Sequence, residues 1–286
     1  MPIRSMLFAP ANHARRVEKS FTLGADAVIL DLEDAVAIAE KPAARSRAID
    51  AVQKPRKCLG YVRVNAMDTP YCYGDLVAIV NPGVDGIILP KVESAAGLQT
   101  VEWVVSQLER ERGLTVGSID IVPILETARA VTNVDAILSA GSRIKRVAFG
   151  AGDYSLDVGV NWSRDEVESR HARNVIVTAS RSHGLEAPID SAYARLDDEE
   201  GLLASARAAA AIGFQGKMCI HPKQVDPVNA VFTPSDEEVA FARRIVVAFK
   251  EAEAKGSSAF QIDGKFVDYP ILFRAQRLLA TVDAIH

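Results

Sequence analysis

Two carboxylates end consecutive predicted strands in the middle of the chain. Glu126 follows the apolar run Ile119–Leu125, Asp153 comes shortly after Val147–Phe149, and a helical segment, Ala128–Ala140, lies between the two runs. Residues just past the ends of parallel strands converge on one face of a β/α sheet. Two such acids can share a hard cation such as Mg²⁺, which prefers oxygen ligands and keeps positions open for substrate. Alternatively, Glu126 only stabilises the first helical turn and Asp153 only lies in a turn.

Polar side chains also follow two earlier predicted strands. Arg63 lies near the end of Leu59–Asn65, and Glu33 and Asp34 follow Ala27–Leu32. The Arg63 guanidinium can hold a substrate carboxylate through two parallel hydrogen bonds. It can equally form an ion pair with an acid of the DLED segment, and the two interpretations are compatible. We expect Glu33 and Asp34 to orient metal-bound water or Arg63 rather than to bind a metal directly.

Other residues suggest rival chemistries. Lys91 follows the predicted strand Gly86–Leu89 and could form a Schiff base if burial lowers its pKa, although a structural ion pair is the simpler interpretation. Ser155 and His221 could suggest a hydrolase, but no G-x-S-x-G motif is present. Because His221 lies at a strand end before Pro222, we expect it to pack there rather than to act in catalysis. Because Asp268 lies on the C-terminal tail, its position predicts exposure to solvent.

Composition limits the classes of protein that fit. The 286 residues suit one large barrel or two ordinary domains. The net charge of −4 and an isoelectric point of about 5.8 provide no basic field for nucleic acid. The three cysteines, Cys58, Cys72 and Cys219, form no C-x-x-C pair, which favours a reducing cytoplasm over a disulfide or zinc framework. No secretory signal or membrane span is expected.

Alternating strand and helix patterns predict the fold. A (β/α)₈ TIM barrel accounts for eight such alternations. The alternative, a doubly wound sheet, is disfavoured because no G-x-G-x-x-G follows the first strand. The predicted strands are Ser5–Ala9, Ala27–Leu32, Leu59–Asn65, Gly86–Leu89, Ile119–Leu125, Val147–Phe149, Ala187–Asp190 and Lys217–Ile220.

Helices are predicted between these strands from capping signals and helix stops. Asn12, Ser94 and Asp197 are the candidate N-terminal caps. The predicted helices run from Asn12 to Leu23, and over Lys41–Val52, Asp75–Val80, Ser94–Arg112, Ala128–Ala140, Arg164–His183 and Asp197–Gly213.

The chain continues past the predicted barrel, so we expect a catalytic domain over residues 1–233 and an extension over 234–286. The extension is predicted to hold a helix over Asp236–Lys255, a hairpin around Asp263-Gly264, and a final helix over Ile271–Ala284. Residues 256–258, Gly-Ser-Ser, are a plausible hinge. Such a tail could act as a lid over a barrel mouth, its own or a neighbour's.

Seven segments together resemble the citrate lyase β-subunit-like family, within the wider group of HpcH/HpaI-type aldolases and malyl-CoA lyases. They span Arg4 to Leu272 in the expected order, so the resemblance covers nearly the whole chain. The segments are RSMLFAPANHARRVEKSFTLGADAVILDLEDAV, YVRVN, GIILPKVES, PILETARAV, FGAGDYSLDVG, GFQGKMCIHPKQV and FVDYPIL. Each is weak alone, and the ordered set is specific.

The resemblance implies a TIM barrel that acts on acyl thioesters with Mg²⁺ as cofactor. By motif, Glu126 and Asp153 would bind the metal, and Arg63 would bind the substrate carboxylate. Ile220, His221 and Pro222 would line the path of pantetheine and coenzyme A. Asp268 would belong to a lid contributed by a neighbouring subunit and would take part in proton transfer, which implies a homo-oligomer such as a trimer or hexamer.

The implied reaction is reversible cleavage of a 3-hydroxyacyl-CoA of the malyl, citramalyl or citryl type into acetyl-CoA and a 2-oxo acid. The sequence does not discriminate among these substrates, since one methylene is worth only about 1–3 kcal/mol in a pocket. Three alternatives stay open. They are a citryl-carrier-protein lyase subunit of citrate lyase, a thioesterase that uses the same site, and a non-catalytic barrel scaffold.

Overall fold

The computed structural model describes residues 2–141 and 143–285. The chain forms two compact units, one over Ile3–Ala230 and a C-terminal unit that begins at Val231. This division falls inside helix α10 (Val225–Phe232). The functional boundary expected after residue 233 lies close to it and stays a prediction.

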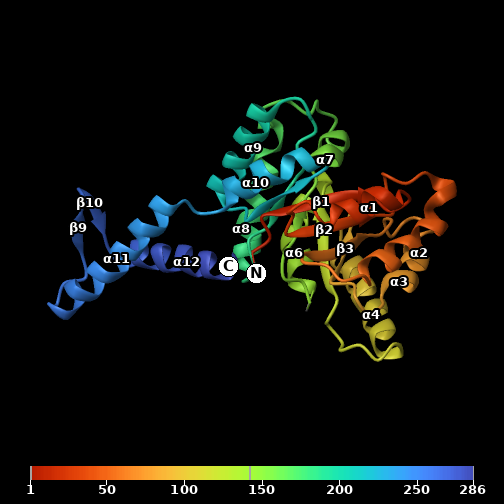
Figure 1. Ribbon diagram of the computed structural model, residues 1–286, viewed down its shortest axis with the longest axis horizontal. Coiled ribbons are helices and arrows are strands. Elements are labelled where there is room, and N and C mark those ends of the chain that lie inside the picture. Colours follow the sequence, from red (N-terminus) through yellow and green to blue (C-terminus); the bar gives the residue numbers. More distant parts are fainter. Residues whose placement is uncertain (1, 142, 286) are drawn as a thin grey trace. The chain divides into compact units, whose positions relative to one another are not determined.

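The first unit is a closed barrel of eight parallel strands (Figure 1). Strands pair in chain order, and β8 pairs with β1 to close the barrel. The (β/α)₈ fold predicted from the sequence is therefore confirmed. The strands are β1 (Ser5–Pro10), β2 (Ala27–Asp31), β3 (Leu59–Arg63), β4 (Gly86–Leu89), β5 (Asp120–Leu125), β6 (Ala148–Phe149), β7 (Ile189–Asp190) and β8 (Gly216–Cys219).

Apolar side chains fill the barrel interior. Because successive strand residues point to opposite sides, only alternate positions face inward. The inward cluster draws on all eight strands and forms a packed core, so the polar groups of a site are expected at the strand ends. Its buried members are Ile3, Met6, Ala27, Ile29, Tyr61, Ile88, Val122, Ile124, Ala148, Ile189 and Met218.

Among the described residues, ten α-helices follow or join these strands, and the last of them, α10, contains the division between the two units. Most cover the outside of the barrel, as the alternating pattern predicts. They are α1 (Ala14–Ser20), α2 (Lys41–Val52), α3 (Cys72–Ile79), α4 (Ala95–Glu111), α5 (Ala128–Thr132), α6 (Val134–Ala140), α7 (Ala151–Asp157), α8 (Arg170–Ser182), α9 (Glu199–Ile212) and α10 (Val225–Phe232). Helix α7 directly follows β6 and was not predicted.

Several predicted helix ends are wrong, and local contacts explain why. Asn12 does not cap α1, because its side-chain amide donates to Glu40 Oε2 at 2.5 Å and His13 takes the cap position. Asp198, one residue later than predicted, caps α9 by accepting from the Gly201 N–H at 2.9 Å. Ser94 caps α4 as predicted.

Two long predicted helices are interrupted or shortened. The helix predicted over residues 128–140 is divided into α5 and α6 at Asn133, whose amide donates to the Glu93 carbonyl at 3.0 Å. The helix predicted from Arg164 begins as α8 only at Arg170, after a 3₁₀ turn at Val167–Ser169. Contacts with other segments thus set boundaries that local sequence does not mark.

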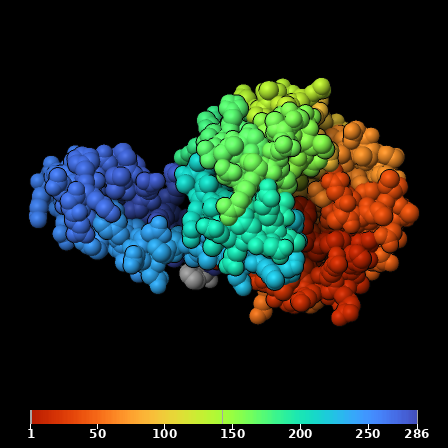
Figure 2. Space-filling view, turned by 90° about the horizontal axis from the view of Figure 1, so that it is seen from above, coloured from red at the N-terminus to blue at the C-terminus, as the bar shows by residue number. Residues whose placement is uncertain are grey.

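The C-terminal unit is a helical body with a hairpin, as predicted (Figure 2, blue). It consists of α11 (Asp236–Ala254), β9 (Phe260–Ile262), β10 (Lys265–Val267) and α12 (Tyr269–Ile285). Asp263 and Gly264 both have positive φ, 48° and 74°, as a two-residue hairpin turn requires. Its core contains Ile245, Phe249 and Val267. Among the described residues, no helix is long and apolar enough to cross a membrane.

Candidate active site

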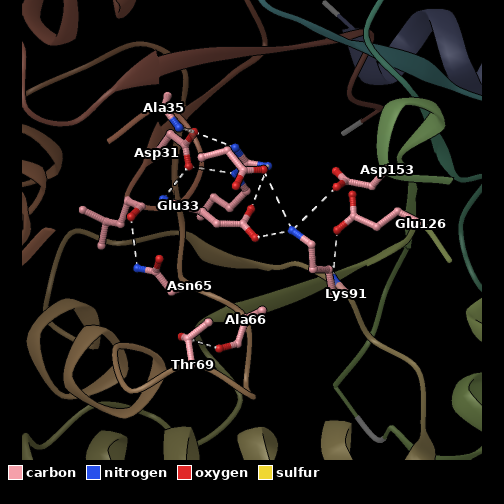
Figure 3. A network of polar contacts seen from close by, with 12 residues as sticks. Asp31, Glu33, Ala35, Asn65, Ala66, Thr69, Lys91, Glu126 and Asp153 are labelled. Carbon is pink, nitrogen blue, oxygen red and sulfur yellow. Dashed lines mark hydrogen bonds and ion pairs between the residues drawn. The ribbon is translucent and has the colours of Figure 1, made fainter. Parts of the chain in front are cut away.

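Neighbouring strands deliver charged side chains to one end of the barrel (Figure 3). Arg63 ends β3, and Lys91 follows β4. Glu126 follows β5, and Asp153 lies in the first turn of α7, just after β6. The DLED segment contributes the remaining acids at the end of β2. The structure therefore brings together every residue that the sequence analysis assigned to the metal, to the substrate carboxylate and to their support.

Glu126 is buried and is held by a backbone contact. Its Oε1 accepts a hydrogen bond from the Lys91 N–H at 2.8 Å. Lys91 has a left-handed backbone, with φ 51°, which is uncommon for a residue with a side chain. Helix α5 is capped by Thr127, whose Oγ1 accepts from the Ala130 N–H. Glu126 therefore lies at the strand ends. Thr127, rather than Glu126, caps helix α5, so Glu126 does not have the helix role that the alternative interpretation gave it.

A glycine lets the Glu126 carboxylate lie against the end of β6. A Cβ atom at Gly150 would be 2.3 Å from Glu126 Oε2. Three residues later, α7 presents Asp153, whose side chain is one-third exposed and whose Oδ1 lies 3.8 Å from Lys91 Nζ. Asp153 is thus a helical residue rather than a turn residue. Glu126 and Asp153 lie on the same side of Lys91, Glu126 against its backbone N–H and Asp153 near its ammonium group (Figure 3).

The charge of this pair is incompletely balanced. Burial, the neighbouring Asp153 and Glu33 together raise the pKa of Glu126 to about 8. Such a shift means that burial and neighbouring negative charges destabilise the ionised form of Glu126, which a bound cation would stabilise. Among the described residues no three His, Cys, Asp or Glu side chains form a metal cluster. Two carboxylates with open positions are nevertheless the donor set that Mg²⁺ uses when substrate completes its coordination, so the residues fit that ion.

Arg63 forms a bidentate pair with Asp31. Its Nε donates to Oδ1 at 2.8 Å and its Nη2 to Oδ2 at 2.6 Å. The two residues are opposite each other in the β2–β3 register. Burial would raise the Asp31 pKa, but the Arg63 charge and hydrogen bonds outweigh it and hold that pKa below its usual value. The expected ion pair with a DLED acid is present, and the strand register selects Asp31 as the partner.

Glu33 lies between the two cations of the site. Its Oε2 is 2.9 Å from Arg63 Nη1, and its Oε1 accepts from Lys91 Nζ at 2.7 Å. Burial, only partly offset by these cations, raises the pKa of Glu33. Asp34 is 60% exposed and lies 4.0 Å from Arg63 and 3.9 Å from Lys91. Glu33 therefore has the contacts of a supporting residue. Asp34 approaches the same two cations only at about 4 Å.

The electrostatics of Lys91 do not favour a Schiff base. Burial alone would lower its pKa, but the hydrogen bond to Glu33 and the charges of Glu33, Glu126 and Asp153 outweigh burial and raise it. A nucleophilic lysine needs the opposite shift, because only the neutral amine attacks a carbonyl. The ion-pair interpretation of Lys91 accounts for its contacts.

Residues 220–222, which follow β8, line a cavity of about 410 Å³. Apolar residues of β1 form much of its wall, and Arg16 and Lys19 of α1 add positive charge. His221 is half-buried at the end of β8. Its Nδ1 accepts from the Lys223 N–H at 3.2 Å and caps a 3₁₀ turn. In the described part of the chain, no hydrogen bond joins His221 to Ser155, as a hydrolase would need.

Asp268 lies in the C-terminal unit, at the start of α12. Its Oδ1 accepts from the Ile271 N–H at 3.3 Å, and its carbonyl accepts from the Leu272 N–H at 2.9 Å. The side chain is half-buried rather than fully exposed. The local role of Asp268 is therefore to cap α12.

The fold and the strand-end residues together define a (β/α)₈-barrel enzyme, since catalytic groups in this fold lie at the C-terminal ends of the strands. The family model described as HpcH/HpaI aldolase/citrate lyase matches residues 4–222. The chain belongs to this family, which the sequence resemblance had indicated, and is a lyase.

Individual relatives match over nearly their whole length. Citrate lyase subunit beta of Leuconostoc mesenteroides subsp. cremoris is 37% identical over 99% of this chain and 94% of its own. L-malyl-CoA/beta-methylmalyl-CoA lyase of Cereibacter sphaeroides is 34% identical over 99% of this chain and 96% of its own. A crystal structure of protein CitE of Mycobacterium tuberculosis, in complex with magnesium, acetoacetate and coenzyme A, has a TM-score of 0.80, 32% identity, and coverage of 99% of this chain and 98% of that chain.

Proposed function

We propose that this protein is a Mg²⁺-dependent carbon–carbon lyase that cleaves a 3-hydroxyacyl-CoA reversibly into acetyl-CoA and a 2-oxo acid. The observation that carries the proposal is the Glu126–Asp153 pair, two carboxylates at the ends of neighbouring strands, with Lys91 beside both. Relatives named as malyl-CoA lyase and citrate lyase subunit beta support the reaction class. Malyl, citramalyl and citryl thioesters are the candidate substrates.

Glu126 and Asp153 would hold the metal, which when bound acts as a Lewis acid on the substrate oxygens. Arg63 would clamp the substrate carboxylate with the N–H groups that remain beside its contacts with Asp31 and Glu33, and would stabilise developing charge. When a general base accepts the hydroxyl proton, the O–H electron pair would form the new C=O bond of the 2-oxo acid, and the electron pair of the broken carbon–carbon bond would become the enolate of acetyl-CoA. Asp268 is proposed to protonate that enolate or, in the reverse direction, to deprotonate acetyl-CoA.

The cavity beside residues 220–222 would accept the coenzyme A chain. Its apolar wall suits pantetheine, and Arg16 and Lys19 supply charge for phosphate. The CitE structure named above contains coenzyme A, which supports this class of ligand. A homotrimer or hexamer and a cytoplasmic location complete the proposal.

The test is a coupled assay with malyl-, citramalyl- and citryl-CoA, with and without EDTA. We expect release of acetyl-CoA and one oxo acid from at least one substrate, abolished by EDTA and restored by Mg²⁺. Glu126→Ala should lose the activity at saturating Mg²⁺, and full turnover by that variant would refute the metal assignment. Cleavage that survives EDTA and is trapped by borohydride would transfer the chemistry to Lys91.

The same assay separates the alternative functions. Cleavage of a citryl group on a carrier protein, without cleavage of citryl-CoA, would indicate a citrate lyase subunit, which the 37% identical relative makes the second candidate. Release of free CoA without an oxo acid would indicate a thioesterase. Failure to bind either Mg²⁺ or thioester would indicate a scaffold.

The contribution of Asp268 is tested by mixing two inactive variants, Asp268→Ala and Glu126→Ala. If Asp268 acts across subunits, mixed oligomers contain some sites with both native residues, and part of the activity returns. No recovery despite demonstrated subunit exchange would exclude sharing between subunits.

A further inference from the structure

Lys41 is a buried cation in an unfavourable position. It is the first residue of α2, where the helix dipole disfavours positive charge. Its side chain is almost fully buried, and burial of an ammonium group is costly unless its donors are satisfied. Because the helix dipole and burial both disfavour the charged ammonium, other contacts must stabilise it.

Three oxygens satisfy the Lys41 ammonium. Nζ donates to the Leu32 carbonyl at 3.0 Å, to the Glu33 carbonyl at 2.6 Å and to Asn65 Oδ1 at 2.6 Å. A lysine has three N–H donors, so these contacts use its full capacity. All three acceptors are uncharged, and the Tyr71 ring lies 5.8 Å from Nζ. The ammonium thus fixes backbone and amide groups rather than pairing directly with an acid.

The contacts continue from Asn65 to a buried carboxylate. Asn65 donates from its backbone N–H at 2.9 Å and from Nδ2 at 2.7 Å to Asp75 Oδ2, and Nδ2 also donates to the Leu32 carbonyl at 3.0 Å. Arg45, one turn after Lys41 on α2, donates to Asp75 Oδ1 at 2.7 Å. The cage formed by Lys41, Asn65, Asp75 and Arg45 therefore joins α2 to the segments that follow β2 and β3.

Those two segments bear the supporting residues of the site. The Glu33 carbonyl is bound by Lys41, whereas the Glu33 carboxylate lies against Arg63 and Lys91. Asn65 is two residues past Arg63. Asn65 lies on the side of Glu33 away from Glu126 and Asp153 (Figure 3). The cage thus contacts the backbone of Glu33, on the side away from the two proposed metal ligands.

We infer that Lys41 is a positioning residue of the reaction. Its ammonium fixes the Leu32–Glu33 backbone and so sets the direction of the Glu33 carboxylate between Arg63 and Lys91. The inference rests on the proposed function for its kinetic consequence, while the placement of Glu33 can be tested without activity.

The test compares Lys41→Met, Glu33→Gln and the double variant. Methionine keeps the length of the side chain but removes all three donors. We expect kcat to fall about 10–100-fold in Lys41→Met, the usual effect of losing a supporting partner, with a smaller change in KM. The Mg²⁺ dissociation constant should change much less than kcat, because among the described residues no hydrogen bond joins the cage to Glu126 or Asp153, and only the charge of Glu33 couples them. Lys54→Met is the matched control, since Lys54 follows α2 and its side chain is 60% exposed.

The double variant distinguishes positioning from general loosening. If Lys41 acts through Glu33, the double variant is no slower than the slower single variant. Multiplied losses, wild-type kcat in Glu33→Gln, or a Mg²⁺ affinity that falls in parallel with kcat would overturn the inference. If Lys41→Met does not fold, Lys41→Gln replaces it, because its amide can still donate to part of the set of acceptors.

A crystal structure of the Lys41 variant keeps this test separate from that of the proposed function. We expect the Glu33 carboxylate to leave hydrogen-bond distance of Lys91 or Arg63. A carboxylate that stays in place would refute the inference even for an active enzyme. Absence of cleavage by the wild-type protein on every thioester would refute the proposed function alone.

Discussion

Arg63 and Asp31 end adjacent strands and meet through two parallel hydrogen bonds, of 2.8 and 2.6 Å. The pair is almost fully buried, since the side chains are 11% and 2% exposed. Asp31 thereby orients the guanidinium that we assign to the substrate carboxylate. The pairing follows from strand register, because residue 31 lies opposite residue 63 in the β2–β3 ladder.

Asp31→Asn should therefore destabilise the protein and reduce activity. Breaking a buried ion pair by removing one partner costs about 3–5 kcal/mol, and the effect can be measured by urea unfolding at pH 7. The lowered Asp31 pKa means that this contribution is present above its ordinary value of 3.8 and is lost as the pH falls through the lower folded-state pKa. Asp31→Asn should flatten that acid limb of the stability curve.

Asp34→Asn is the matched control for this prediction. Asp34 belongs to the same segment but is largely exposed, and 4.0 Å separates it from Arg63. An exposed pair at this distance contributes less than about 0.5 kcal/mol. Equal losses of stability in the two variants would contradict the role assigned to Asp31.

Mg²⁺ binding should release a proton from Glu126. In the metal-free site, burial, Asp153 and Glu33 raise the Glu126 pKa to about 8, so the group holds a proton at pH 7. A ligand carboxylate must be deprotonated, and Mg²⁺ affinity should fall by up to about tenfold per pH unit below that value. Calorimetry in buffers of different ionisation enthalpy should count close to one proton at pH 7.

The same shift predicts a pH-dependent stability of the metal-free protein. Because the folded-state pKa is the higher one, the folded state binds more protons between the ordinary value of 4.5 and about 8. Metal-free stability should therefore fall as the pH rises through that window, and Glu126→Gln should remove the slope. An unchanged slope in the variant would assign the titration to another group.

The order of strands and helices along the sequence was sufficient to predict the barrel and to group the proposed site residues at one end of it, whereas their proposed roles rest on the family resemblance. Eight strand–helix alternations indicated the barrel, and parallel strands place their ends on one face. Arg63, Glu126 and Asp153 could be grouped on that basis alone. No detailed geometry was needed, because the topology itself brings the ends of β3, β5 and β6 together.

Contacts that use backbone atoms or depend on close approach could not be predicted. The acceptors of Lys41 are two carbonyls and an amide, which leave no pattern in residue types. Helix α7 follows a strand of only two residues, so no periodic run marked its start. The backbone of Lys91 is left-handed and directs its N–H to Glu126. The sequence does not indicate this conformation, because lysine has no preference for it.

Lys91→Gly and Lys91→Ala should separate backbone strain from charge. Both remove the ammonium that lies between Glu33 and Asp153, so both should lower kcat to a similar extent. Glycine adopts φ 51° without a Cβ penalty, and Lys91→Gly should be more stable than Lys91→Ala by about 1 kcal/mol. Thermal unfolding of the metal-free variants measures the difference. If the alanine variant is the more stable, the left-handed conformation of residue 91 is not present in solution.

Gly150→Ala should weaken Mg²⁺ binding although residue 150 carries no ligand. Its backbone, with φ −112°, accepts any residue, so only the contact with Glu126 excludes a side chain. A Cβ would be 2.3 Å from Glu126 Oε2 and would displace the buried carboxylate. We expect a loss of about 10–100-fold in Mg²⁺ affinity, measured by calorimetry. Gly152→Ala is the control, because its Cβ would meet only the edge of the Trp162 ring at 3.1 Å. Equal affinity in the two variants would show that Glu126 does not require the space that Gly150 leaves.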